Sequence, residues 1–191
     1  MYCSLKMQTG ASTLKVGSGG FTLAELLIVV VLVVILAAIA LPNLLRSQIA
    51  ANETAAIESL AKINRAEVQY QTTYPTIGFA STLGALGPGT LDGKCREKSP
   101  AHACLIEAAL ATATSPEHTR SGYWFAVSPT SRDAGDVVTG YVATAQAGVL
   151  NKTGSRDFCS QEDAVIRYSV PQGSSVPANS APACSAMTIL Q

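Results

Sequence analysis

Residues 19–42 decide the fold and read GGFTLAELLIVVVLVVILAAIALP. They contain sixteen consecutive apolar residues, 26–41, with the carboxylate of Glu25 directly before them. As an α-helix, residues 21–45 would reach roughly 37 Å, which is enough to cross a hydrocarbon layer of about 30 Å. The stretch therefore predicts a helix that inserts into a membrane.

The small residues of a possible cleavage site lie on an unusual side of this helix. A secretory signal peptide is cleaved after its apolar run, whereas the pair Gly19-Gly20 lies before it. Cleavage after Gly20 would leave the apolar helix on the mature protein, with Phe21 as its new amino terminus. Residues 1–20 are thus predicted to be a leader, and Cys3 would leave with it.

Residues 20–25, Gly-Phe-Thr-Leu-Ala-Glu, followed by an apolar helix, resemble the prepilin peptidase site of type IV pilins and of the pseudopilins of type II secretion. The resemblance implies cleavage between Gly20 and Phe21, methylation of the Phe21 amine, and packing of the helices into a filament core. It also implies that Glu25 of an incoming subunit pairs with the Phe21 amine of a subunit already in place, which sets the axial register. The alternative is an ordinary signal anchor, with Glu25 solvated near the membrane surface.

Pro42 lies inside the predicted rod and follows the apolar run. It removes one backbone hydrogen bond, so a kink or a locally opened helix is expected. The family shares a proline at this place, which implies a role in assembly; the alternative is a tolerated kink without such a role.

Charge and length limit the classes of function. The chain has 191 residues, so cleavage would leave 191 − 20 = 171. Lys+Arg and Asp+Glu are 13 each, and because Lys6 and Lys15 lie in the leader, the mature part has a net charge of 11 − 13 = −2. This balance argues against a nucleic-acid-coating protein. Lysines before a first membrane helix favour the cytoplasmic side, so the carboxyl-terminal part should face outward.

The helical pattern continues beyond Pro42 in amphipathic form, and the helix is predicted over residues 21–74, with the membrane part over 21–45. Apolar residues recur at spacings of three, four or seven, namely Leu45, Ile49, Ala56, Leu60 and Ile63. The other faces carry Arg46, Asn52, Glu53, Glu58, Lys62 and Arg65. Glu58 and Lys62 have the spacing of a helix ion pair, and Tyr74-Pro75 marks the end.

The cysteines after the membrane helix would lie in an oxidising compartment and form two disulfides. Four cysteines allow three pairings, and we favour Cys95 with Cys104 and Cys159 with Cys184. The second pair closes a loop of about 25 residues, worth about 3 kcal/mol. This cysteine-bracketed region resembles the variable surface loop of type IV pilins.

The remainder predicts an α+β domain, with a long helix packed on three or four antiparallel strands. The family resemblance implies that this arrangement is a pilin fold. Residues 75–120 are rich in glycine and form a connecting loop region, with a short helix within 103–113. Residues 121–191 form the sheet and the terminal loop. Strands are predicted at 123–127, where Pro129 ends the strand, at 137–145 and at 164–170, with Trp124 in the core.

No catalytic constellation is visible, and we expect no enzyme and no cofactor. His102 and His118 have no recognised zinc spacing. Calcium is a feature of major pseudopilins, and the carboxylates that could supply oxygen ligands in turns are Asp133, Asp136, Asp157, Glu162 and Asp163. Solvated turns are the favoured interpretation. The basic cluster of Lys94, Arg96 and Lys98 lacks interleaved aromatic residues, so a solvated loop is favoured over nucleic-acid binding.

The favoured function is a structural subunit of a type IV pilus for adhesion, motility or surface contact. The alternative is a major pseudopilin of a type II secretion system, and a DNA-uptake pilin is the least favoured. The expected partners are further copies of the chain, the prepilin peptidase, the inner-membrane assembly platform, and lipid before assembly. The precursor is expected in the inner membrane with its globular part periplasmic, and the assembled form in an extracellular pilus or a periplasm-spanning pseudopilus.

Overall fold

The computed structural model describes residues 20, 22–90, 92–171 and 180–190. Within them lie four helices and five strands, in the order α1, α2, α3, β1, β2, β3, β4, α4, β5. The chain divides into two compact units, Met1–Leu41 and Pro42–Gln191.

The helix α1 spans Leu23–Thr73, within one or two residues of the predicted range. Thr22 caps its start: the Thr22 side-chain oxygen accepts a hydrogen bond from the Glu25 backbone N–H at 3.2 Å. Glu25 occupies the first turn, where a carboxylate interacts favourably with the helix dipole. The helix stops before Tyr74, since Pro75 disfavours the α conformation of the residue preceding it.

The first unit contains the amino-terminal part of α1, which is long and apolar enough to cross a membrane by length and composition. Its large apolar side chains between residues 23 and 41 are all exposed, from 49% for Val31 to 83% for Leu23. A continuous exposed apolar surface of this kind is unfavourable in water and suits a lipid or protein environment.

The second unit contains an antiparallel sheet with strand order β1-β2-β3-β4-β5. The strands are β1 Tyr123–Arg132, β2 Val138–Ala147, β3 Asp157–Gln161, β4 Arg167–Ser169 and β5 Thr188–Ile189. The α+β class is confirmed, but the predicted count of three or four strands is wrong, because the described residues form five. β3 escaped prediction because buried polar residues interrupt its apolar pattern, and β5 because it is only two residues long.

β1 forms one edge of the sheet and continues past Pro129, where the sequence predicted its end. Proline lacks a backbone N–H, and an edge strand tolerates this because one side of it has no strand to bond. The pairing of β1 with β2 shifts register between Pro129 and Ser131, and again between Ser131 and Arg132. The edge is therefore irregular in its second half.

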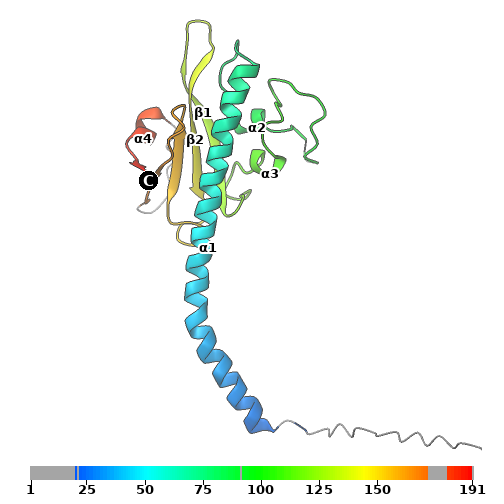
Figure 1. Cartoon of the computed structure of the whole chain (residues 1–191), viewed down its shortest axis with the longest axis vertical. Coiled ribbons are helices and arrows are strands. Elements are labelled where there is room, and N and C mark those ends of the chain that lie inside the picture. The colour runs from blue at the N-terminus through cyan, green and yellow to red at the C-terminus, as the bar shows by residue number, and fades with distance from the viewer. Residues whose placement is uncertain (1–19, 21, 91, 172–179, 191) are drawn as a thin grey trace, which may run out of the picture. The chain divides into compact units, whose positions relative to one another are not determined.

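The core lies between the sheet and the second part of α1 (Figure 1). The predicted helix residues Ala56, Leu60 and Ile63 are buried, whereas Leu45 is 60% exposed, because it precedes the part of α1 whose residues enter the core. β1 contributes its odd-numbered residues, and those at the centre of the core are Tyr123, Phe125 and Val127. Successive side chains of a strand point to opposite faces of the sheet, so Trp124 lies on the face opposite to Tyr123 and Phe125. Trp124 is only half-buried there, and its prediction as a core residue is wrong.

Three short helices complete the second unit. α2 spans Leu83–Leu86 and α3 spans Ala108–Ala111, so the helix predicted within 103–113 is a single turn. The two pack together beside α1 and bury Leu86 and Leu110 (Figure 1). α4, Ala181–Ser185, follows the sheet and precedes β5.

A buried ion pair fastens α1 to the loop before β3. One oxygen of Glu53 accepts hydrogen bonds from the backbone N–H and the hydroxyl of Ser155, at 2.9 and 2.6 Å. The other oxygen accepts two from the Arg156 guanidinium, at 2.9 and 2.6 Å. Burial alone would raise the pKa of Glu53, but these hydrogen bonds and the charge of Arg156 lower it. The sequence analysis placed Glu53 outside the apolar face of the helix. In the structure Glu53 is buried, because it pairs with Arg156, which lies 103 residues away in the sequence.

Replacing this carboxylate should destabilise the domain. Glu53→Ala is expected to lower the free energy of unfolding by about 3 kcal/mol, because it leaves the half-buried Arg156 charge unpaired. Chemical unfolding of the detergent-solubilised chain measures this value. Glu58→Ala, which removes an exposed carboxylate from the same helix, should change it by less than about 0.5 kcal/mol. Equal losses in the two variants would contradict the role of the Glu53 ion pair.

Candidate functional site

The residues predicted for processing lie at the start of the first unit. Gly20 is exposed just before α1, and no described atom lies within 4 Å of the position that a Cβ would take there. Phe21 lies outside the described residues, so cleavage before it and methylation of its amine stay predictions.

The residues predicted for assembly have different local settings. The Glu25 side chain is exposed in the first turn of α1, and its role in setting register stays a prediction. Pro42 lies within α1, but its side chain falls outside the described part of the structure, so the expected kink also stays a prediction. The sequence analysis missed one local property: Thr22 and Glu25 have the S/T-x-x-E spacing of a helix start.

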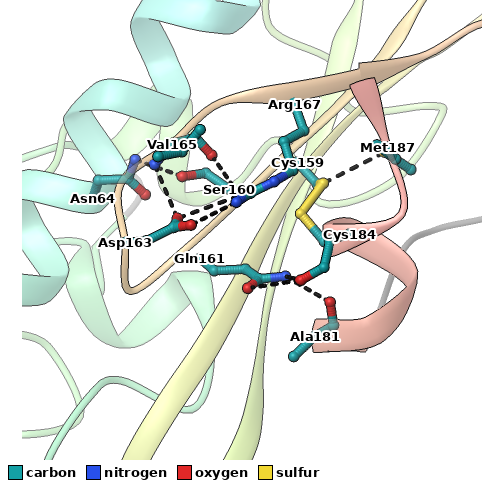
Figure 2. Close-up of a disulfide and its surroundings, with 11 residues drawn as sticks. Asn64, Cys159, Ser160, Gln161, Asp163, Val165, Arg167, Ala181, Cys184 and Met187 are labelled. Carbon is teal, nitrogen blue, oxygen red and sulfur yellow. Dashed lines mark hydrogen bonds and ion pairs between the residues drawn. A yellow bond between two sulfur atoms is a disulfide. The ribbon is translucent and has the colours of Figure 1, made fainter. Parts of the chain in front are cut away.

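The second predicted feature, the carboxyl-terminal disulfide, joins Cys159 of β3 to Cys184 of α4 (Figure 2). The two sulfurs form a small second core with Val142 and Met187. The Cys159 sulfur lies 3.4 Å from the Met187 sulfur. This pairing is the one favoured from the sequence, and it holds α4 against the sheet.

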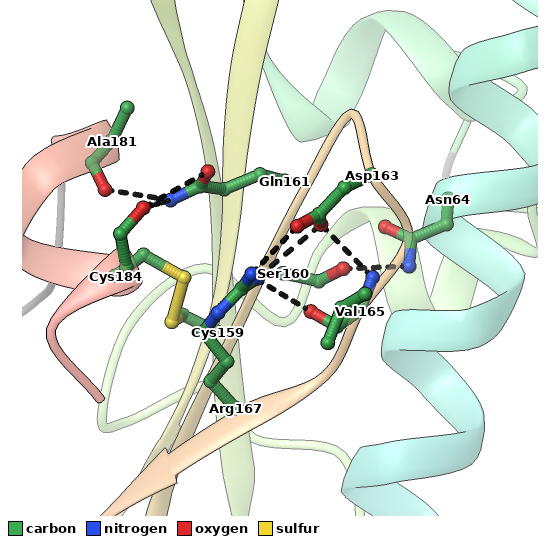
Figure 3. Close-up of polar contacts among 10 residues, drawn as sticks. Asn64, Cys159, Ser160, Gln161, Asp163, Val165, Arg167, Ala181 and Cys184 are labelled. Atoms are coloured by element: carbon green, nitrogen blue, oxygen red, sulfur yellow. Dashed lines mark hydrogen bonds and ion pairs between the residues drawn. A yellow bond between two sulfur atoms is a disulfide. The ribbon is translucent and has the colours of Figure 1, made fainter. Parts of the chain in front are cut away.

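Polar contacts support the same region on either side of the disulfide (Figure 3). The Gln161 amide donates a hydrogen bond to the Ala181 carbonyl at 2.6 Å, which gives α4 a second attachment to β3. From the opposite face of the sheet, the Asn64 side chain of α1 donates to the Ser160 hydroxyl at 2.8 Å. β3 is therefore fixed to α4 on one face and to α1 on the other.

The first disulfide, Cys95–Cys104, also has the favoured pairing and closes a loop with a sequence separation of 9. The basic residues at and within this loop are exposed, namely Lys94 just before Cys95, and Arg96 and Lys98 inside the loop. Arg96 lies 3.4 Å from Asp92, which offsets part of the positive charge. The loop thus fits the favoured interpretation of a solvated surface segment better than a nucleic-acid site.

The carboxylates considered as calcium ligands have different local partners. Asp133 accepts hydrogen bonds from Gly135 and Val137 in the β1–β2 turn, and Asp136 pairs with Arg132 at 3.1 Å. Asp163 pairs with Arg167 at 2.6 Å, and this hydrogen-bonded guanidinium lowers the pKa of the carboxyl.

The remaining two differ in burial: Glu162 is exposed, whereas Asp157 is buried in β3 and accepts from the Ala147 N–H at 3.1 Å. Among the described residues no three His, Cys, Asp or Glu side chains gather as metal ligands. His102 packs against Gly89, and His118 lies 3.2 Å from the Ser115 hydroxyl, so the two histidines serve separate turns.

One buried carboxyl was not singled out from the sequence. Glu67 of α1 is fully buried; one oxygen accepts the Ala80 N–H at 2.8 Å and the other has no hydrogen-bond partner. No ion pair to Glu67 occurs within the described part of the chain. Burial therefore raises the pKa of Glu67 to about 8, so the carboxyl is mainly protonated at neutral pH. The sequence signal that could have indicated burial of Glu67 is its helix spacing from the buried residues Ile63 and Tyr70.

This carboxyl predicts a pH dependence of stability. Between pH 4.5, the ordinary pKa of the group, and about pH 8, the folded state binds a proton that the unfolded state has lost. The free energy of unfolding should fall as pH rises through this range, by at most about 1.4 kcal/mol per pH unit. Glu67→Gln keeps an acceptor for Ala80 and should flatten the slope, as unfolding at pH 5 and pH 8 would measure. Parallel pH profiles for the two proteins would contradict the effect.

Removal of the carboxyl-terminal disulfide should also be costly. The double variant Cys159→Ser, Cys184→Ser is expected to lose about 3 kcal/mol of unfolding free energy through loop entropy, in addition to packing in the second core. Thermal unfolding and limited proteolysis after residue 170 measure this loss. The pair Cys95→Ser, Cys104→Ser is the matched control and should cost less, because its loop is shorter and Cys95 is exposed. A smaller loss for the first variant would contradict the assignment.

Comparisons with known proteins do not assign the chain to a family. No family model matches the chain, and neither a curated protein nor a solved structure does.

Proposed function

We propose that this chain is the structural subunit of a type IV pilus, which polymerises through α1 into a surface filament for adhesion, motility or surface contact. The observation that carries the proposal is the combination of Gly20-Phe21 with an apolar, exposed helix that follows directly. A leader cut before the anchor would retain that helix in the mature protein. Its apolar side chains would then exchange lipid for the helices of neighbouring subunits.

The globular part supports the same proposal. Both disulfides suit an outward, oxidising compartment. The Cys159–Cys184 link gives the terminal segment a covalent attachment to the sheet, as an exposed surface of a fibre would need.

The proposed partners follow from this assignment. The precursor would sit in the inner membrane with its domain in the periplasm, be cut by the prepilin peptidase, and be passed by an assembly platform to the growing filament. Glu25 of the incoming chain would pair with the Phe21 amine of its neighbour.

Electron microscopy of a strain lacking the protein tests the proposed function. Loss of long surface fibres is expected, with restoration by the intact gene. Intact fibres together with a defect in protein secretion would overturn the pilus assignment in favour of a secretion pseudopilus.

The role of Glu25 can be separated from helix capping. Glu25→Gln retains a side chain suited to a helix start but removes the charge, so cleavage should proceed while filament assembly is lost. Thr22→Ala removes the cap but keeps the carboxylate and should still assemble. Immunoblots of processed chain and counts of sheared filaments measure the two steps. Normal filaments from Glu25→Gln would refute the register role.

A further inference from the structure

The two disulfides of this protein differ in how far solvent can reach them. Cys159 and Cys184 are both fully buried in the second core. Cys95 is exposed and Cys104 is half-buried. Thiol–disulfide exchange requires a thiolate to reach one of the two sulfurs, so access decides which disulfide reacts. Cys95 is therefore the cysteine that a dissolved thiol meets first.

The chain around Cys95 forms an exposed strap, which we define as residues 92–98. All of its residues are exposed. The Thr90 hydroxyl donates a hydrogen bond to the Lys94 carbonyl at 2.8 Å, and the Asp92 carboxylate accepts one from the Lys94 N–H and pairs with Arg96. In the described part of the chain, no hydrogen bond or ion pair joins the strap to residues outside 90–98. Apart from its two chain ends, the strap is held to the domain by the first disulfide.

The other cysteine of this disulfide is fixed by its backbone. The Cys104 N–H donates a hydrogen bond to the Gly87 carbonyl at 3.1 Å, and the Ala103 N–H donates to the Ala85 carbonyl at 2.8 Å. Breaking the disulfide would therefore leave Cys104 attached to the domain, while Cys95 would move away with the strap. The two halves of the bond are unequal in mobility as well as in exposure.

Positive charge surrounds the exposed cysteine. Lys94 and Arg96 are its neighbours in the sequence. The strap as a whole carries three cations and two carboxylates, a net charge of 3 − 2 = +1, and these residues are Lys94, Arg96, Lys98, Asp92 and Glu97. Cations next to a cysteine favour the thiolate form, which is both the attacking and the leaving species in exchange. The setting thus suits attack by a thiol that itself carries negative charge.

We propose that Cys95–Cys104 is a site of thiol–disulfide exchange, at which a low-molecular-weight thiol with carboxylate groups becomes attached to Cys95. The thiolate sulfur of the small molecule forms a bond with the Cys95 sulfur. The bond to Cys104 breaks, its electron pair stays on the Cys104 sulfur, and that sulfur takes up a proton from water. One disulfide replaces another, so the step needs no further oxidant or reductant.

The exchange is reversible within the same loop. The Cys104 sulfur lies 3.8 Å from the His102 carbonyl oxygen, which can accept a weak hydrogen bond from the new S–H. Attack of the Cys104 thiolate on the mixed disulfide at Cys95 expels the small thiol and closes the loop again. Between the two steps the strap and its cations are free of the domain. This inference does not depend on the proposed function, because it uses the strap and its disulfide alone.

Reduced glutathione is the probe for the exchange. The full-length, detergent-solubilised chain carries Cys3→Ser to remove the leader thiol, and samples are alkylated with iodoacetamide at intervals and mapped by mass spectrometry. Early samples should carry glutathione on Cys95 and the alkyl group on Cys104. The first disulfide should react about tenfold or more faster than Cys159–Cys184, the internal control. Equal rates at the two disulfides, or glutathione mainly on Cys104, would overturn the proposal.

The role of the cations is tested by neutral variants of the strap. The double variant Lys94→Gln, Arg96→Gln should slow the reaction with glutathione about threefold or more, and added salt should remove most of the difference. Glu97→Gln, which removes a negative charge from the same strap, is the matched control and should not slow it. Equal slowing in the two chains, or none in the first, would overturn the preference for a negatively charged thiol.

Trypsin reports whether the strap is released, because Lys94, Arg96 and Lys98 are its cleavage sites. Cleavage within the strap should accelerate about fivefold or more after exchange, since a segment with few attachments opens easily. The variant Cys95→Ser, Cys104→Ser should show the same fast cleavage without any thiol, and circular dichroism checks that its domain is folded. Unchanged cleavage in a folded double variant would show that the disulfide does not hold the strap and would overturn the release.

Discussion

The packing of one face of α1 against the sheet is the constraint on which the rest of the domain depends. Ala143 and Ala145 of β2, with Tyr123 and Phe158 of the neighbouring strands, belong to the same buried core as the inward residues of α1. Glu53 adds a fixed polar link that sets how the helix is turned about its own axis. Since the buried face is fixed, so is the face that remains for other molecules.

One helix therefore serves two environments in succession. Its first part presents large apolar side chains that water does not tolerate as a continuous surface, and its second part is half-covered by a disulfide-linked domain. Removal of the proposed leader from the amino-terminal side would keep both parts on one chain. The domain would then be carried along with whatever the apolar part joins, as the proposed filament subunit requires.

Local sequence signals predicted the features that depend on nearby residues. The apolar run and Pro75 identified α1 within two residues at each end, and the sequence-local pairing of the four cysteines agrees with both disulfides. Features with distant partners could not be predicted in this way. β3 is polar in sequence because Ser160 meets Asn64 across 96 residues, and Glu53 is buried because Arg156 neutralises it across 103. The roles of Gly20, Phe21, Glu25 and Pro42 rest on the resemblance alone.

The irregular edge of β1 has a consequence for the proposed subunit, which would be held at high density in a membrane before assembly. An unpaired strand edge can template further strands and lead to aggregation. Here Pro129 and the two register shifts interrupt that edge, and the Phe125 N–H is already bonded to the Ala113 carbonyl at 2.7 Å. The opposite edge, β5, is only two residues long. Crowded domains would thus be protected from amyloid-like association through their sheets, and the proposed self-association would be left to the helix.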